Sequence, residues 1–176
     1  MAVKSKKRTA AIVCLVVLIL AAIFSAGYFG IDYIRQDEKS SRAIRVISAD
    51  SSQQIAEKII EKTEIKDLSK LRNDQVSKYY GVPMDIIDVS VVYKSQSTTE
   101  ADEIAVFKVS EKMNIDVVTQ AIDGRLSECR SSYATLNDTE SQKVENCLIE
   151  SSGEYIILVI CSDTLSAGEA IAEFYK

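Results

Sequence analysis

The longest apolar stretch of the chain lies near its start. Residues 10–24 contain no polar side chain, and after Ser25 the apolar run continues to residue 29. A helix of about 20 residues is about 30 Å long, which matches the hydrocarbon layer of a membrane. A secretory signal peptide usually has a shorter apolar region, about 7–15 residues, before its cleavage site. The run therefore predicts an uncleaved transmembrane helix; the alternative is a signal peptide cleaved after Ser25-Ala26-Gly27.

Charges beside this run predict its orientation. The four cations that precede it lie close together, at Lys4, Lys6, Lys7 and Arg8. Dense positive charge at one end of a transmembrane helix favours the cytoplasmic side for that end. We therefore expect four parts: a basic cytoplasmic tail over residues 1–8, a transmembrane helix over 9–31, a juxtamembrane tether over 32–49 and an extracytoplasmic α+β domain over 50–176.

Three segments beyond the tether show apolar residues at helical spacing. They are "DSSQQIAEKIIEKTEI", "IDVVTQAIDGRLSECRSS" and "TLSAGEAIAEFYK". Asn114 precedes the second segment and is the expected N-cap, since its side chain suits that position. Between the first two segments, "DLSKLRNDQVSKYYG" predicts one or two short helical turns that end at Gly81.

Four other segments have the composition of strands. "DVSVVYKS" alternates apolar and polar residues and leads through a polar loop to "EIAVFKV", which predicts a hairpin. "KVENCLIE" and "YIILVICSD" flank a turn and predict a second hairpin. The last of these is apolar on both faces, which indicates a strand covered on both sides. The pattern predicts one α+β domain in the order α-ββ-α-ββ-α, with a mainly antiparallel four-stranded sheet and packed helices.

Charge and composition exclude several functions. All 26 acidic residues but only 17 of the 21 Lys and Arg residues lie beyond residue 31, so this part carries a formal charge of −9. Such a charge disfavours binding to nucleic acid. The chain has no His, which removes the commonest general base and metal ligand. No nucleophile elbow, Ser-x-x-Lys pattern, Walker loop or dinucleotide glycine motif is present. We predict no enzyme activity and no cofactor.

Acidic residues gather where the second predicted strand begins. Glu100, Asp102 and Glu103 lie within four positions of each other. Three carboxylates in a loop would suit calcium, but the spacing matches no calcium-binding loop, so a solvated turn is expected and no metal.

Arg125 and three tyrosines are the other residues of interest. Arg125 is expected to pair with Glu103 or to cap a strand end; the alternative is that it holds an anionic ligand. Tyr93, Tyr133 and Tyr155 are expected to pack in the core or at its rim; the alternative is that they line one surface. The predicted contact residues are Tyr93, Glu100, Glu103, Arg125 and Tyr133.

Three cysteines lie in the predicted domain, at positions 129, 147 and 161. They are expected to be small buried side chains. The alternative is one disulfide, either Cys129–Cys147 or Cys147–Cys161, because an odd number leaves at least one thiol free.

The segments "VYKSQSTTEADEIAVFKV" and "GEYIILVICSD", with Arg125 and Tyr133 between them, resemble a bacterial family of small extracytoplasmic proteins. It is the domain of unknown function 4358 family, found in Gram-positive, clostridial-type bacteria. The resemblance covers residues 49–176 and implies location and fold but no reaction. Members often carry a lipoprotein signal in place of a membrane helix. They also tend to have a proline shortly after the loop tyrosine, which "YATLNDTES" lacks, so a differently shaped loop is expected.

These features together predict a non-catalytic binding or regulatory module at the cell envelope. A single helix would hold it in the plasma membrane, with the N-terminus in the cytoplasm. Its partners would be that membrane and an unknown envelope or membrane protein, with no nucleic acid. One alternative is a structural accessory subunit of a membrane complex, and another is an envelope enzyme.

Overall fold

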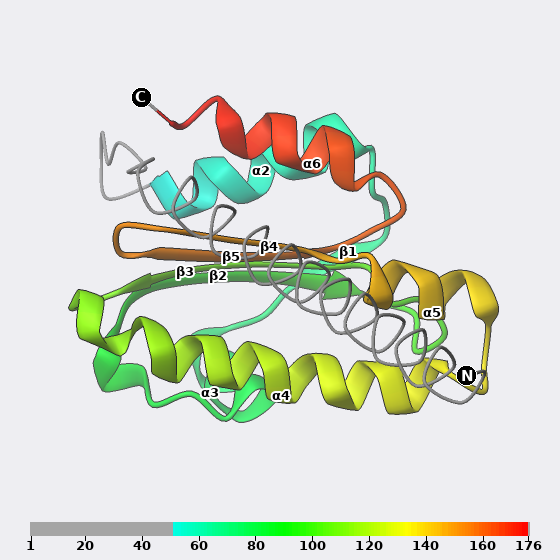
Figure 1. Cartoon of the computed structure of the whole chain (residues 1–176), viewed down its shortest axis with the longest axis horizontal. Helices are drawn as coiled ribbons and strands as arrows, with labels where there is room; N and C mark the ends of the chain where they lie inside the picture. The colour runs from blue at the N-terminus through cyan, green and yellow to red at the C-terminus, as the bar shows by residue number, and fades with distance from the viewer. Residues whose placement is uncertain (1–50, 176) are drawn as a thin grey trace, which may run out of the picture. The chain divides into compact units, whose positions relative to one another are not determined.

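A five-stranded sheet forms the centre of the computed structural model, which describes residues 51–175 (Figure 1). The strand order is β1-β2-β3-β5-β4 and every neighbouring pair is antiparallel. The strands are β1 (Leu68–Lys70), β2 (Ile87–Ser95), β3 (Glu103–Val109), β4 (Leu148–Ser152) and β5 (Tyr155–Ile160). The predicted α+β class, single domain and two hairpins are confirmed, but the predicted number of four strands is wrong.

Helices cover both faces of this sheet (Figure 1). One face packs against α2 (Ser51–Thr63) and α6 (Thr164–Ala172), and the other against α3 (Asn73–Tyr80) and α4 (Ile115–Tyr133). Helix α5 (Asp138–Glu145) packs beside α4. Two short 3₁₀ helices, η1 (Met84–Ile86) and η2 (Lys112–Asn114), precede β2 and α4.

Side-chain alternation distributes each strand between two cores. In β2, Val91 faces the core under α2 and α6, whereas Val92 faces the core under α3 and α4. All six residues of β5 are buried, because helices cover the strand from both sides. This confirms the prediction for the apolar last strand. Burying one valine, leucine or isoleucine side chain of this strand stabilises the fold by about 1.5–3 kcal/mol.

The fifth strand is β1, at one edge of the sheet. Its three residues pair with Tyr93, Lys94 and Ser95 of β2. The sequence predicted only helical turns in this region, and a strand of three residues is too short to show an alternation. The helix that follows, α3, ends as predicted at Gly81, which has a left-handed φ of 65°.

The second hairpin begins later than predicted. Residues 143–145 belong to α5, and β4 starts only at Leu148. Helix α5 forms because Asn137 caps it: the Asn137 side chain accepts a hydrogen bond of 2.9 Å from the Thr139 N–H. The sequence pattern did not show the boundary between α5 and β4, because the apolar residues after Asn146 made the whole segment resemble one strand.

Two other helices begin where the sequence pattern predicts, but their first turns show which side chains cap them. Asn114 precedes α4 but makes no capping hydrogen bond; its Nδ2 donates to the Ser110 hydroxyl at 3.2 Å instead. Helix α6 begins at Thr164, and the Asp163 carboxylate accepts a 3.0 Å hydrogen bond from the Ser166 N–H. A short acidic side chain therefore caps this helix.

Within residues 51–175 we find no helix with the length and apolar character needed to cross a membrane. The predicted cytoplasmic tail, transmembrane helix and tether over residues 1–49 lie outside the described residues. These assignments stay predictions.

Two glycines offer a matched pair of substitutions. A Cβ added to Gly81 or Gly124 would meet no atom within 4 Å. The effect of an alanine at the two positions therefore differs only through the backbone conformation. We expect G81A to lower the free energy of unfolding by about 1 kcal/mol, since its φ is left-handed. G124A, inside α4, should raise it by roughly 0.5–1 kcal/mol. Urea unfolding of the full chain measures both, and equal effects would contradict this explanation.

Candidate functional site

A buried ion pair joins the sheet to α4. Glu103 is the first residue of β3, and its side chain is 1% exposed. The Arg125 Nη2 and Nε atoms donate to Glu103 Oε2 at 2.9 and 3.3 Å. This geometry confirms the predicted pair of Arg125 and Glu103. A charge at the entry of a central strand needs such a partner, because burial without one is costly.

Two tyrosines of α3 complete this pair. The Tyr79 hydroxyl donates to Glu103 Oε2 at 3.1 Å, and the Tyr80 hydroxyl donates to Oε1. Arg125 Nη2 also donates to the Tyr79 hydroxyl, and the Arg125 guanidinium carbon lies 4.1 Å from the centroid of the Tyr79 ring. Both oxygens of Glu103 therefore have partners, and the guanidinium is stacked on an aromatic ring.

The same contacts determine protonation. Burial and the Glu103 charge raise the pKa of Tyr79 and of Tyr80 above the usual range of tyrosine. For Arg125, burial lowers the pKa, but the Glu103 charge and hydrogen bond outweigh it and the net change is upward. Burial raises the pKa of the nearby Cys129 thiol to about 11. At neutral pH the arginine stays charged, and the tyrosines and the thiol stay protonated.

The three acidic side chains at the end of the β2–β3 loop and the start of β3 point to three different partners. Asp102 pairs with Lys143 of α5 at 2.7 Å, whereas the carboxylate of Glu100 accepts a 2.9 Å hydrogen bond from the Ser95 hydroxyl. Glu103 binds Arg125. Among the residues that the structure describes, no three metal-ligating side chains gather at one point. The predicted solvated turn is wrong for Glu103, which is buried, and for Asp102, which is 13% exposed.

Helices α4 and α5 hold this loop from two sides. The hydroxyl of Tyr133, at the end of α4, donates to the Glu100 carbonyl at 2.8 Å. The buried Glu140 of α5 accepts a hydrogen bond of 2.7 Å from the Ala101 N–H. Lys143 binds both Glu140, at 3.0 Å, and Asp102. The loop is therefore fixed by two hydrogen bonds to its backbone, one of them to a carboxylate, and by the ion pair of Asp102.

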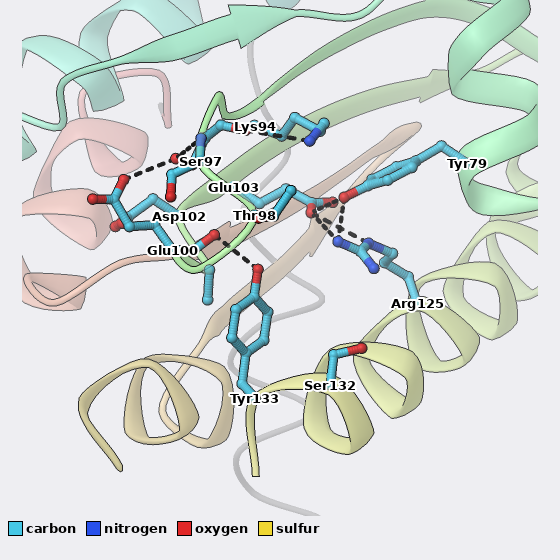
Figure 2. A pocket seen from close by; sticks show the side chains of 12 residues that line it. Tyr79, Lys94, Ser97, Thr98, Glu100, Asp102, Glu103, Arg125, Ser132 and Tyr133 are labelled. Carbon is cyan, nitrogen blue, oxygen red and sulfur yellow. Dashed lines mark hydrogen bonds and ion pairs between the residues drawn. The ribbon is translucent and has the colours of Figure 1, made fainter. Parts of the chain in front are cut away.

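A pocket of about 200 Å³ lies between this loop, α3 and α4 (Figure 2). Four of the five predicted contact residues line it, namely Glu100, Glu103, Arg125 and Tyr133. Its other side chains include Tyr79 and Lys94, which sequence reasoning did not select. The alternation of β2 placed Lys94 opposite Tyr93, but no local signal marked it as part of a pocket.

Tyr93 lies on the other face of the sheet. It packs against the α2 and α6 core, and its hydroxyl accepts a 2.8 Å hydrogen bond from Gln53 Nε2. Tyr155 is buried in that same core, whereas Tyr133 packs in the core under α3 and α4. The three tyrosines therefore pack in or against the two cores, as expected, and the alternative of one common surface is wrong.

The three cysteines of the domain are free thiols. Cys129 and Cys161 are buried and Cys147 is partly buried, so neither of the two alternative disulfides is formed. Burial raises the pKa of the Cys161 thiol to about 11 and also raises that of Cys147. Cys129 and Cys161 behave as small core side chains with low reactivity, whereas Cys147 is more accessible.

Comparison with protein families matches residues 61–161 to the model described as Domain of unknown function (DUF4358). The matched segment is more than half of the chain and includes every residue that lines the pocket. No curated protein and no solved structure matches the chain.

Proposed function

Since this chain belongs to the domain of unknown function 4358 family, we propose from its own site that it is a non-catalytic binding or regulatory module. The ligand would enter the pocket that Arg125, Tyr79 and the β2–β3 loop enclose, which we call the Arg125 pocket. A polar pocket with hydroxyl, ammonium and guanidinium groups suits recognition of a small polar molecule.

The main support is the preorganised wall of this pocket. Glu103 fixes Arg125 through two hydrogen bonds, and Tyr79 stacks on the guanidinium. Side chains that are ordered before binding lose little conformational entropy when the ligand arrives. The wall is therefore built for recognition at low entropic cost.

Protonation supports binding over catalysis. The pKa values of Tyr79 and Tyr133 are raised by burial, which keeps their hydroxyls protonated at neutral pH. A general base needs a pKa near the working pH. The Cys129 thiol, whose pKa is about 11, is too rarely a thiolate to serve as a nucleophile.

Location outside the plasma membrane is the second half of the proposal. The apolar run within residues 9–31 and the four cations before it would hold the domain at the outer face, with the N-terminus in the cytoplasm. A tether of this kind raises the effective concentration of the pocket near an envelope partner.

The alternative function is an accessory subunit of a membrane complex. It is favoured by the small residues of the apolar run, Ala21, Ala22, Ser25 and Ala26, which allow close helix packing. Replacement of the run by an unrelated transmembrane helix separates the two functions. A module keeps its cellular role after the exchange, and a subunit loses it.

One labelling experiment tests binding and location together. Thr98 lies on the rim of the pocket and is exposed, so T98C in a C147S background provides one reactive thiol. Intact cells that carry the full chain are treated with a membrane-impermeant maleimide bearing a photoreactive group. We expect labelling without lysis and, after illumination, one reproducible crosslinked species.

The matched control is K112C, an exposed position beyond the other end of β3. It should be labelled equally and yield no such species. Labelling of T98C only after lysis would contradict the proposed location. Identical crosslinks from both positions would contradict binding at the Arg125 pocket.

A further inference from the structure

One cation of the Arg125 pocket has no acidic partner. Lys94 is half-buried, and its Nζ donates to the Ser95 carbonyl at 3.2 Å and lies 5.9 Å from the Tyr79 ring centroid. Among residues 51–175 its ammonium forms no ion pair. Arg125, the other cation of the pocket, is bound to Glu103. Lys94 is therefore the cation of the pocket lining whose ammonium is left without an ion pair.

The acids of the pocket make their ion pairs and hydrogen bonds with other groups, although Glu103 stands opposite Lys94 in the β2–β3 ladder. Asp102 shares Lys143 with Glu140, and Glu103 is paired with Arg125. Figure 2 shows the carboxylate of Glu100 on the side of the loop away from Lys94 and Arg125. Lys94 and Arg125 instead lie on either side of Tyr79. The ammonium of Lys94, beside the Tyr79 ring, is thus a charged hydrogen-bond donor in this part of the pocket that a negative group can use.

Arg125 itself is less available to a ligand. Besides Glu103, its Nη1 faces Glu128 at 3.7 Å, and that carboxylate is 70% exposed. The guanidinium charge is therefore shared between two acids of the chain. We assign recognition of the ligand's charge to Lys94 for this reason.

We infer that the Arg125 pocket binds a small organic carboxylate, with Lys94 as the residue that recognises its charge. This inference rests on the proposed function and names the ligand class of that pocket. A single ammonium without an ion pair can neutralise a monoanion, whereas it would leave the second charge of a phosphate without a partner in the pocket. The carboxylate belongs either to a free organic acid or to the carboxyl end of a peptide.

The size and polarity of the pocket define the rest of the ligand. Its volume of about 200 Å³ is below the roughly 300–1,000 Å³ of sites for larger organic ligands. The hydroxyls of Ser97, Thr98 and Ser132 line it and both donate and accept hydrogen bonds. The ligand is therefore a small acid, or the last residue of a chain, with further polar groups beside the carboxylate.

The test follows backbone amide signals of the isotope-labelled full chain by nuclear magnetic resonance. The probes are N-acetylalanine, its neutral amide, N-acetyltrialanine and inorganic phosphate. We expect the two carboxylates, but not the amide, to shift the signals of residues 95–102. A charged hydrogen bond of ordinary strength means that K94M weakens binding at least about tenfold. K94R should retain part of the affinity, and K112M should leave it unchanged.

The outcomes separate this inference from the proposed function. Tighter binding of N-acetyltrialanine than of N-acetylalanine supports a peptide carboxyl end, and the reverse order supports a free acid. Equal shifts with acid and amide, or unchanged binding by K94M, overturn the role of charge and leave the binding module intact. Response to phosphate alone also overturns the carboxylate. If no probe shifts the signals, the inference of a carboxylate ligand is overturned. The proposed binding function is then still tested by the crosslinking experiment with T98C.

Discussion

E103A is expected to lower the free energy of unfolding by about 3–5 kcal/mol, the usual cost of breaking a buried ion pair from one side. The side chains of Glu103 and Arg125 are 1% and 13% exposed, so the guanidinium left behind would have little access to water. The Tyr79 and Tyr80 hydroxyls would lose their acceptor at the same time. Urea unfolding of the full chain, followed by circular dichroism, measures the change.

Asp88 provides the control for this experiment. It pairs with Lys108 but is 48% exposed, so D88N should cost no more than about 1 kcal/mol. A cycle with R125M isolates the pair itself. We expect the double variant to lose about 0.5–3 kcal/mol less than the sum of the two single losses. Strict additivity would show that Glu103 and Arg125 do not stabilise each other.

F107A is expected to have an effect of similar size, a loss of about 3–5 kcal/mol. Phe107 lies on β3, is completely buried, and meets the Tyr80 ring edge-on at a centroid distance of 5.0 Å. The substitution removes this contact and leaves a cavity between the sheet and α3. Urea unfolding again gives the value, and the slope of the transition shows whether the native state stays compact.

Leu165 is the matched position on the surface. It is 83% exposed, so L165A should change stability by no more than about 0.5 kcal/mol. A loss below about 1.5 kcal/mol for F107A would mean that α3 collapses onto the vacated space. In that case Tyr80 would move, and the Arg125 pocket would be less rigid than we propose.

The two substitutions act on one structural unit. Tyr80 packs on Phe107 with its ring and donates to Glu103 with its hydroxyl. The apolar core under α3 therefore positions a group that orders the pocket wall. Loss of the core contact should weaken ligand binding even though Phe107 does not line the pocket.

Local periodicity was enough to predict several elements. The alternation in β2, the apolar run of β5 and the helical spacing of α4 each lie within one short segment, so the sequence alone shows which faces are buried. The adjacency of each hairpin pair follows from the short connections. The pairing of Glu103 with Arg125 was also predicted, from the opposite charges of a residue at a strand entry and a residue on the middle helix, but the burial of Glu103 was not.

Other features depend on contacts between distant segments. β1 exists because Leu68–Lys70 pair with the far end of β2, and the boundary between α5 and β4 depends on a cap at Asn137. No local pattern shows that β3 pairs with β5 in the centre of the sheet.

The Arg125 pocket is the clearest case. Helix α3 brings Tyr79 and Tyr80 to Glu103, and the strand alternation sends Lys94 to the pocket and Tyr93 to the opposite core. The sequence determined which segments are strands, helices and apolar faces, because those depend on neighbouring residues. Only the tertiary structure decided which polar side chains meet, because their partners are supplied by segments far apart in the chain.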